Sequence, residues 1–259
     1  QPDHARIEPP PSGRPLVERA RALLHGASEL QREVALLKGG DTGELTVSAG
    51  AYPAELCIPG ALALLLSTHP RISVRVRVRD WRDIAADVES EAVDVGLGEI
   101  SEAEGHDRLE TELVGAHEIL FVGRPGHPLS TRRRVGFDEI FAFPLAGTAW
   151  PARAAKRLPP GPLAGGTVDR ATGRFYPVVT VDRAADVKEL VQRTDFLTFL
   201  TRSQCAAELA DGTLAALPFA APWARTNYGF VWRRGRMRTP AALAFAAAVR
   251  AVEAERRGR

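Results

Sequence analysis

The strongest constraint on the fold lies between residues 45 and 97, where short strand-like runs alternate with segments of helical length. Strands are expected at residues 45–49, 72–79 and 93–97, with helices at residues 53–68 and 82–90 between them. Strands that alternate with helices of this length are typical of a mostly parallel sheet with helices on both faces. The sequence therefore predicts an α/β fold.

The second of these strands has one polar face. Its apolar and polar residues alternate in the order Ile72, Ser73, Val74, Arg75, Val76, Arg77, Val78 and Arg79. This alternation is expected at a sheet edge, whereas interior strands of a parallel sheet are almost continuously apolar. An edge position for the second strand, beside an interior first and third strand, predicts the strand order 2-1-3.

A second series of strands and helices begins near residue 117. Strands are expected at residues 117–124, 143–146, 178–181 and 196–200, and helices near residues 137–141, 151–157, 184–193 and 202–210. The closing strand at 228–233 and helix at 240–255 resemble the first series more than the second. We therefore predict two lobes with mostly parallel five-stranded sheets, the first formed by residues 43–118 and 224–259 and the second by residues 119–223. The chain then crosses between lobes near residues 115–120 and 218–225, which makes a hinge.

Residues 14–38 have the pattern of a helix that pairs with another helix. Gly39 and Gly40 end the segment, and no proline follows Pro15 within it. Its apolar residues are spaced alternately four and three apart, as at the a and d positions of three heptads: Leu16, Ala20, Leu23, Ala27, Leu30, Val34 and Leu37. A surface helix lying on its own domain is the alternative, although it would usually show a wider apolar face. We therefore expect residues 1–42 to hold a helix through which two copies of the chain associate.

Composition narrows the class of protein. The chain has 259 residues, of which 45% are hydrophobic and 25% charged, so it is long enough for two compact lobes. No apolar run approaches the roughly 20 residues needed to span a bilayer, and residues 1–4 have no feature of a signal peptide. We expect a soluble, cytoplasmic protein. Its net charge of +2 is too small to indicate that these residues bind nucleic acid themselves.

The sequence carries no recognisable catalytic or metal-binding motif. G-x-S-x-G, H-E-x-x-H, the P-loop and a complete G-x-G-x-x-G are absent, and the six histidines do not have the spacing of metal ligands. Cys57 and Cys205 lie far apart among apolar neighbours, as buried free cysteines usually do. We therefore expect no metal, no cofactor and no enzymatic activity. An enzyme would need an acid, base or nucleophile in the cleft between the lobes.

Two aromatic residues precede prolines at expected helix starts. Tyr52-Pro53 follows the first strand, and Trp150-Pro151 follows a strand of the second series. In open α/β sheets ligands bind beyond the carboxyl ends of strands, where helix N-termini offer N–H groups to anions. A purely structural role of proline at the first helical position is the alternative. We expect the two pairs to face each other across a cleft that binds a small anionic or aromatic molecule. The hydroxyl donors expected there are Ser48, Thr148 and Thr201.

Several short motifs follow one another in a specific order along the chain. They are residues 7–13 running into 16–20, then 43–50, Ile58-Pro59, His69-Pro70, residues 91–98, Arg124-Pro125-Gly126-His127-Pro128-Leu129, and residues 214–218. In this order and spacing the sequence resembles the LysR-type transcriptional regulators over nearly its whole length. Residues 7–13 resemble the end of that family's winged DNA-binding domain, and the segment after them resembles its linker helix.

The resemblance implies that the chain is the effector-binding and oligomerisation part of a bacterial regulator. The implied fold is periplasmic-binding-protein-like (type 2), with dimers formed by the linker helix and often tetramers. Promoter DNA would be contacted by a winged helix-turn-helix ahead of Gln1. The implied pocket lies between the lobes, and the residues implied to line it are Ala51, Tyr52, Pro53, Thr148, Ala149, Trp150 and the stretch 198–201, with Thr198 and Thr201 as ligand-binding residues.

Three departures from the family pattern bear on the pocket. Arg193-Thr194-Asp195-Phe196 stands where the family commonly has a Gly-x-Gly turn, and Tyr52 is bulky for a position that often carries a small hydroxyl residue. Cys205 is alone in the second lobe, which disfavours sensing by a disulfide. A solute-binding protein of the same fold that serves transport is the alternative function. It predicts an exported monomer, which the paired-helix pattern does not favour.

Overall fold

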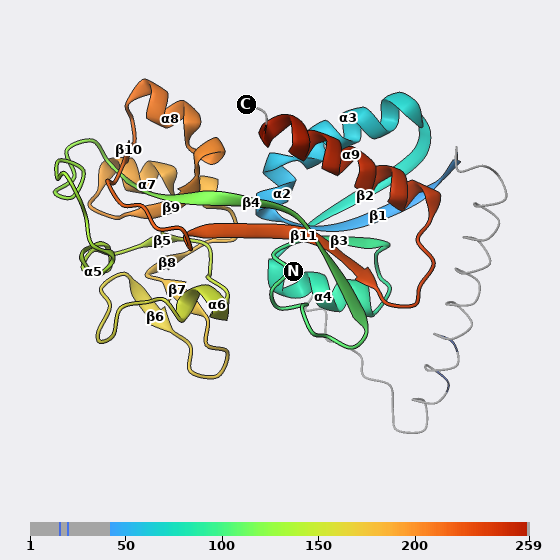
Figure 1. Cartoon of the computed structure of the whole chain (residues 1–259), viewed down its shortest axis with the longest axis horizontal. Helices are drawn as coiled ribbons and strands as arrows, with labels where there is room; N and C mark the ends of the chain where they lie inside the picture. Colours follow the sequence, from blue (N-terminus) through green and yellow to red (C-terminus); the bar gives the residue numbers. More distant parts are fainter. Residues whose placement is uncertain (1–15, 17–19, 21–41, 258–259) are drawn as a thin grey trace, which may run out of the picture.

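The computed structural model describes Leu16, Ala20 and residues 42–257. The described elements gather in two lobes that lie side by side, joined by the long strands β4 (Leu109–Gly123) and β11 (Arg225–Arg233) (Figure 1). These strands pair with each other in antiparallel register from Leu109↔Arg233 to Glu118↔Arg225. The second half of β4 then continues into the other lobe. This shared pair of strands sets how the two lobes face each other, and therefore where a cavity between them can lie.

The first lobe contains the predicted strand order. Strand β1 (Thr42–Gly50) pairs in parallel with β2 (Arg71–Arg79) on one side and with β3 (Val95–Gly98) on the other, so the order 2-1-3 is confirmed. Strand β11 pairs antiparallel with β3 and brings β4 into the sheet. Among the described residues, four of the five strands of this lobe point the same way.

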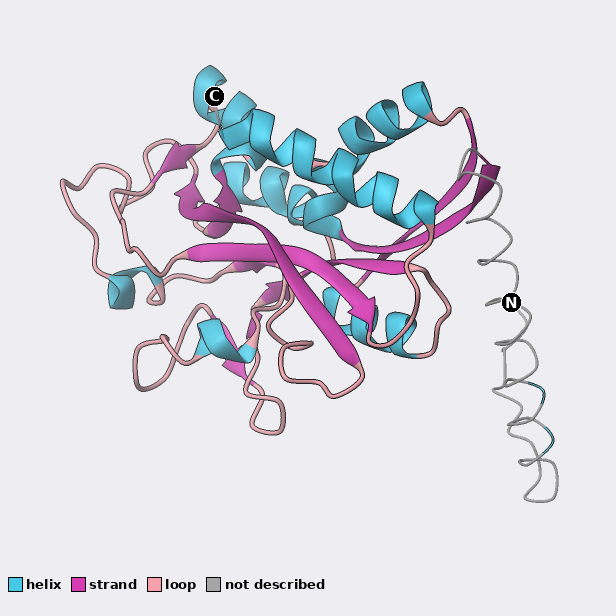
Figure 2. Ribbon diagram, turned by 45° about the vertical axis from the view of Figure 1, so that its right-hand side comes forward, coloured by secondary structure: helices cyan, strands magenta, loops and turns pink. Residues whose placement is uncertain are grey.

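Helices cover both faces of this sheet (Figure 2). One face packs against α2 (Ala51–Leu56), α3 (Ile58–Thr68) and α9 (Pro240–Arg257) through buried residues such as Leu65, Phe230 and Phe245. The opposite face packs against α4 (Trp81–Glu89), whose Ile84 and Val88 are fully buried. Strand β11 and helix α9 thus pack with the sheet and helices of this lobe.

The second lobe is built from shorter elements. Strands β9 (Thr198–Thr201) and β10 (Ala215–Ala216) flank the second half of β4 in antiparallel register. Strand β5 (Ala146–Gly147) pairs in parallel with β8 (Val179–Thr180), and a bridge from Leu145 to Leu197 links it to β9. The remaining elements are α5 (Phe137–Ile140), α6 (Ala152–Ala155), the 3-10 helix η2 (Ala184–Val187), α7 (Lys188–Arg193), the 3-10 helix η3 (Arg202–Gln204) and α8 (Ala206–Asp211).

A small hairpin was not predicted. Strands β6 (Gly166–Val168) and β7 (Phe175–Pro177) pair antiparallel, and Asp169 stabilises their turn by accepting the backbone N–H groups of Ala171 and Thr172. The hairpin extends from the second lobe beside α6 (Figure 1). Its residues contact the first lobe, as described below.

Three expectations from the sequence were wrong in detail. The helix predicted at residues 53–68 is two helices that meet at Cys57, because proline at position 59 lacks an N–H and cannot continue the preceding helix. The strand predicted at residues 117–124 is only the second half of β4. On the edge strand β2, Ile72 is buried but Val78 is 55% exposed, so the predicted apolar face is not covered to its end.

The predicted pairing helix falls almost entirely outside the described residues. Leu16 and Ala20 are helical and exposed, with 73% of Leu16 accessible. The other predicted pairing positions lie outside the described residues: Leu23, Ala27, Leu30, Val34 and Leu37. In the described part of the chain, no helix is both long and apolar enough to cross a membrane.

Candidate functional site

A cavity of about 420 Å³ lies between the two lobes. Its size is within the range of pockets that bind small molecules. The first lobe contributes the end of β1 with the start of α2, the start of α4, and Glu99 after β3. The second lobe contributes residues 148–151, Arg153, Ala154 and Arg157 around α6, together with residues 180–182 and part of β9. Residues of both crossing strands, β4 and β11, also line the cavity. The carboxyl ends of β1 and β3 therefore open into the cavity, as the general rule for α/β sheets requires.

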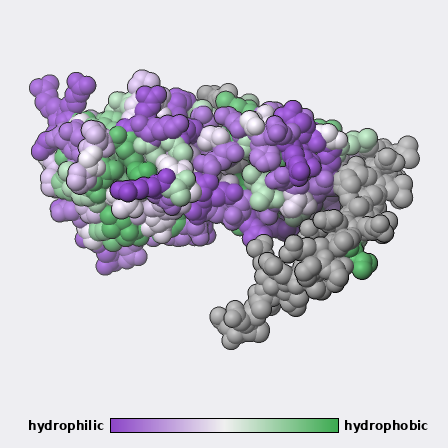
Figure 3. Space-filling model, turned by 90° about the horizontal axis from the view of Figure 1, so that it is seen from below, coloured by the Kyte–Doolittle hydropathy of each residue, from purple (hydrophilic) through white to green (hydrophobic). Residues whose placement is uncertain are grey.

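Aromatic rings form the wall on the side of the second lobe. Trp150 meets Phe199 edge to face with ring centroids 4.9 Å apart, and Phe121 lies 6.2 Å from Trp150. All three are almost completely buried, and Trp223 also lines the cavity. The face of the molecule seen in Figure 3 is largely hydrophilic, with smaller hydrophobic patches on the side of the second lobe. The cavity wall, in contrast, is lined by a continuous group of aromatic rings.

A second aromatic cluster lies where the strands cross. The Tyr52 ring lies 5.7 Å from Tyr228 and 5.8 Å from His117. The Tyr228 hydroxyl donates to Oε2 of the buried Glu253 at 2.7 Å, and His117 Nε2 lies 3.2 Å from the same oxygen. Burial raises the pKa of both tyrosine hydroxyls, so they stay protonated, and the Tyr228 hydroxyl is the donor to Glu253.

The charged residues of the cavity are mostly paired. Asp80 caps α4 by accepting the backbone N–H of Arg82 at 2.9 Å, and it also accepts the Arg82 Nε–H at 2.7 Å. Burial alone would raise the pKa of Asp80, but the hydrogen bonds from Arg82 outweigh it and hold that pKa below its ordinary value. Arg153 donates to Glu99 through Nη2 at 2.6 Å and Nε at 3.3 Å. Among the described residues, Arg157 has no ion-pair partner.

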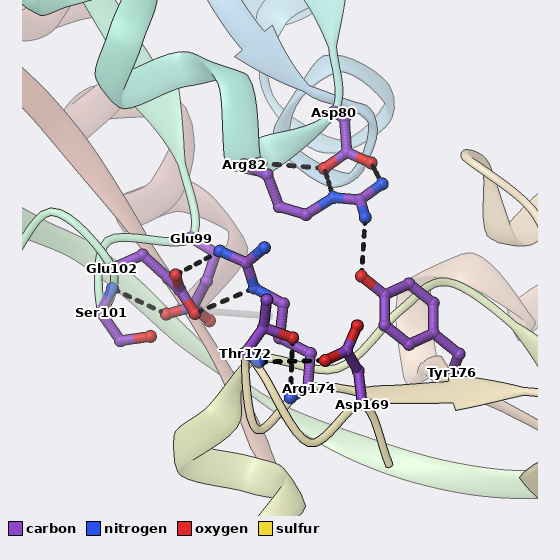
Figure 4. Close-up of polar contacts among 9 residues, drawn as sticks. All are labelled: Asp80, Arg82, Glu99, Ser101, Glu102, Asp169, Thr172, Arg174 and Tyr176. Atoms are coloured by element: carbon purple, nitrogen blue, oxygen red, sulfur yellow. Dashed lines mark hydrogen bonds and ion pairs between the residues drawn. The ribbon is translucent and has the colours of Figure 1, made fainter. Parts of the chain in front are cut away.

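Among the described residues, four polar contacts made by side chains cross from one lobe to the other. Glu99 meets Arg153 beside the cavity, and Gln204 Nε2 donates to Glu55 at 3.2 Å. The hairpin supplies the other two: Arg174 Nη2 donates to Glu102 at 2.5 Å, and Arg82 donates to the Tyr176 hydroxyl at 3.0 Å (Figure 4). The guanidinium of Arg174 also lies 5.3 Å from the centre of the Trp81 ring. The cleft is thus bridged by side chains at several points.

Most of the predicted pocket residues meet at this cavity. Those that line it are Ala51, Tyr52, Pro53, Thr148, Ala149, Trp150 and Thr201. Thr198 does not, because side chains alternate along β9: Phe199 and Thr201 line the cavity, while Thr198 is fully buried and outside the lining. Ser48 is also buried outside the lining, and its hydroxyl donates to Asp87 at 2.7 Å.

The two prolines are not at the first helical position. Pro53 is the third residue of α2 and Pro151 precedes α6 as its N-cap residue. The sequence interpretation missed the charged members of the site, above all Glu99 and Arg153. The signal for Glu99 was present, since it directly follows the third strand of a parallel sheet, at the edge where ligands bind.

Neither cysteine is positioned for redox chemistry with the other. Both are free and completely buried, and each thiol donates to a backbone carbonyl four residues earlier, Cys57 to Pro53 and Cys205 to Thr201. Burial raises the pKa of Cys57 to about 12, which disfavours the reactive thiolate. Within the described ranges, no cluster of three or more His, Cys, Asp or Glu side chains could hold a metal ion.

Two α/β lobes around a cavity, joined by two crossing strands, define a periplasmic-binding-protein-like (type 2) domain. The chain belongs to the LysR family of transcriptional regulators, because the family model described as LysR substrate binding domain matches residues 38–254.

Curated relatives are transcriptional regulators. The SDS degradation transcriptional activation protein of Pseudomonas sp. (strain ATCC 19151) is 32% identical over 236 residues, which cover 90% of this chain and 74% of the relative. The HTH-type transcriptional regulator GbpR of Azospirillum brasilense is 27% identical over 255 residues, covering 96% of this chain and 72% of the relative. The relatives support a regulatory role and do not support the alternative of a transport protein.

Solved structures share the fold. The OxyR C206 mutant of Corynebacterium glutamicum superposes with a TM-score of 0.65 at 16% identity, covering 98% of this chain and 78% of that one. Full-length CbnR in complex with its target DNA gives a TM-score of 0.60 at 16% identity, covering 98% of this chain and 83% of that one.

Proposed function

We propose that this chain is the sensory part of its regulator and that the cavity between the lobes binds a small anionic or aromatic effector. The observation that carries the proposal is the composition of the cavity wall. Aromatic rings from both lobes surround about 420 Å³ of space, and arginines stand among them. Apolar surface with a few placed polar groups is the usual make-up of a small-molecule site. Effector binding changes the regulator only if the effector has different affinities for the open and closed arrangements of the lobes.

The residues proposed to contact the effector come from both lobes. Tyr52 and its neighbours Ala51 and Pro53 line the side of the first lobe, and Trp150 with its neighbours Thr148 and Ala149 lines the opposite side. Thr201 supplies a hydroxyl at the end of β9. One relative is named for SDS degradation, which makes alkyl sulfates one effector class to include in a screen.

We further propose that the pairing helix of residues 14–38 joins two copies of the chain, as a dimer or within a tetramer. The heptad spacing supports this arrangement. Relatives named as HTH-type regulators support contact with promoter DNA through a helix-turn-helix domain in the whole protein. Such a regulator acts in the cytoplasm, where bacterial promoters are, and no catalytic step is assigned to it.

A thermal-shift screen tests the proposed cavity. Benzoate, other aromatic carboxylates and alkyl sulfates are added to the purified chain, and a ligand at 100 times its Kd is expected to raise the Tm by about 5 to 10 °C. Tyr52→Ala and Trp150→Ala should remove the shift because each removes a wall of the cavity. Met237→Ala, an exposed apolar residue outside the cavity, is the matched control and should keep it. A shift that persists unchanged in both cavity variants would contradict the proposed site.

A further inference from the structure

We propose that Arg153 binds the acidic group of the effector, and that Glu99 occupies this position when no effector is bound. The inference rests on the proposed function of the cavity and narrows its ligand to one chemical class. That class is a single-headed anion, a carboxylate or sulfate ester, attached to an apolar body. Glu99 is then an internal competitor of the effector.

The geometry of the Glu99–Arg153 pair is that of a bound carboxylate. Both oxygens of Glu99 accept from the guanidinium, Oε2 from Nη2 at 2.6 Å and Oε1 from Nε at 3.3 Å. Oε1 also accepts the backbone N–H of Ser101 at 3.0 Å (Figure 4). A planar guanidinium fork matches the paired oxygens of a carboxylate, and those of a sulfate equally well. Because both residues line the cavity, an effector can reach the position that Glu99 now holds.

Three of the other four cavity arginines are held by groups of their own lobe, whereas Arg157 has no ion-pair partner among the described residues and is the rival that the test below must separate from Arg153. Arg82 is held by Asp80 within the same helix start, and Asp80 is fixed there because it caps α4. Arg79 lies 3.4 Å from Asp87, and Arg225 donates to the carbonyl of Ala116 at 2.6 Å. The acidic or carbonyl partners of these three arginines lie in their own lobe, although Arg82 also donates to the Tyr176 hydroxyl across the cleft. The acidic partner of Arg153 comes from the opposite lobe, so the pair separates if the lobes move apart.

A buried donor three residues before Arg153 is a second, independent indication of a ligand. Trp150 is 93% buried, since only 7% of it is exposed, and it lines the cavity. No acceptor among the described residues meets its indole N–H. A buried donor without a partner is destabilising, and native structures rarely keep one without a reason. The indole N–H is thus an unpaired donor on a residue that lines the same cavity as Arg153.

The apolar part of the effector has a surface to contact. Phe121, Phe199 and the face of Trp150 form a wall of rings that offers no charge. A small inorganic anion would leave this wall uncovered, whereas a neutral apolar molecule would leave Arg153 with Glu99. Only a molecule with both parts satisfies both features of the cavity.

Calorimetric titration of the whole chain with matched probes tests the assignment. The anionic probes are decyl sulfate and decanoate, and the neutral probe with the same chain is 1-decanol, all used below micellar concentrations. Glu99→Gln should tighten binding of the anions by about five- to tenfold, because it removes the internal competitor, and should leave decanol within twofold. Arg153→Gln should abolish the preference for anions over decanol. Arg153→Lys, which keeps the charge without the fork, should retain part of it.

A second ion pair across the cleft supplies the matched control. Glu102→Gln breaks the contact with Arg174, and neither residue lines the cavity. An equal gain in anion affinity from Glu102→Gln would mean that loosening the cleft explains the effect, and would overturn the proposal. Loss of the anion preference in Arg157→Gln but not in Arg153→Gln would also overturn it.

The outcomes separate this inference from the function on which it rests. Equal binding of anions and decanol by wild type and Glu99→Gln contradicts the role of Arg153 but leaves a ligand-binding cavity in place. Failure of every variant, including wild type, to bind any probe contradicts the inference, and when the thermal-shift screen is also negative it contradicts the proposed function too.

Discussion

At the scale of single residues, the junction of the lobes depends on close packing around Glu253. A Cβ atom added at Gly115 on β4 would lie 2.5 Å from Glu253 Oε1 and 2.7 Å from the Tyr228 ring. Distances this short force the neighbours to move. Glycine at this position therefore allows the buried carboxylate and the tyrosine to approach the strand.

Gly115→Ala is expected to lower the free energy of unfolding by about 1 to 3 kcal/mol, because overpacking displaces Glu253 and Tyr228. Gly43→Ala on β1 is the control, since no atom lies within 4 Å of the added Cβ there, and it should change stability by less than about 0.5 kcal/mol. Urea unfolding measures both. Equal stability of the two variants would show that the junction accommodates the methyl group.

Asp80 stabilises the chain as an ionised helix cap. Its pKa is held below the ordinary value of 3.8, so its favourable contribution is present above pH 3.8 and is lost as the pH falls through the lowered pKa. Asp80→Ala should cost about 1 kcal/mol near neutral pH, and Asp80→Asn less, because asparagine also caps helices. Unfolding curves between pH 3 and pH 7 should show the wild-type advantage over Asp80→Asn shrinking below pH 4. An advantage that grows on acidification would contradict the assigned direction of the pKa shift.

At the scale of elements, the β6–β7 hairpin connects the lobes. Tyr176 lies on its second strand and accepts a hydrogen bond from Arg82 of the first lobe. Arg174, directly before that strand, donates to Glu102 of the first lobe (Figure 4). Both contacts are polar and partly exposed, so each contributes modestly and is easily broken. The hairpin is therefore suited to hold the cleft together without preventing it from opening.

Arg174→Ala should loosen the hairpin, because it removes the ion pair with Glu102 and the contact with the Trp81 ring. If the free energy of opening the hairpin falls by about 0.5 to 1 kcal/mol, the amide hydrogens of residues 166–177 should exchange about two to five times faster. Arg193→Ala is the control: it breaks an ion pair with Glu189 in which both side chains are 74% exposed, and it should leave the exchange rates of the hairpin unchanged. Equal amide exchange rates in the hairpin of wild type and both variants would show that the contacts of Arg174 do not stabilise it.

The regular elements followed from the sequence and the irregular ones did not. The order β2-β1-β3 could be predicted because the alternation in residues 72–79 indicates a sheet edge. The hairpin could not, because strands of three residues have too short a pattern to distinguish from loops. Thr198 was misplaced because the family resemblance suggested a stretch of residues, while the period of two along a strand decides which of them face the cavity. The pair of Glu99 and Arg153 depends on contacts between distant segments, which no local pattern encodes.

At the scale of the whole molecule, the arrangement supports a movement of two bodies. We propose that residues 43–118 and 224–259 move together against residues 119–223, with bending in β4 and β11 where they pass between lobes. The two strands are paired on both sides of a register shift between Tyr228 and Gly229, so they connect the lobes as one ribbon with an irregular point within it. Under this proposal, an effector bound between the lobes changes their angle, and the predicted pairing helix transmits the change to a second copy of the chain.

Association through the pairing helix is the prediction on which this transmission depends. Leu16 is helical and 73% exposed, so its apolar side chain is available to a second copy. Replacing Leu23 and Leu30 together by aspartate places charges at two d positions of the heptad pattern and should abolish pairing at micromolar concentration. Glu29→Lys, on another face of the same segment, is the control and should leave the mass of the assembly unchanged. Sedimentation equilibrium distinguishes the cases: wild type should give at least twice the chain mass of 28.0 kDa and the double variant a lower mass than wild type. A double variant with the same mass as wild type would place the contact between copies elsewhere, and the helix would then lose its assigned role in carrying the signal.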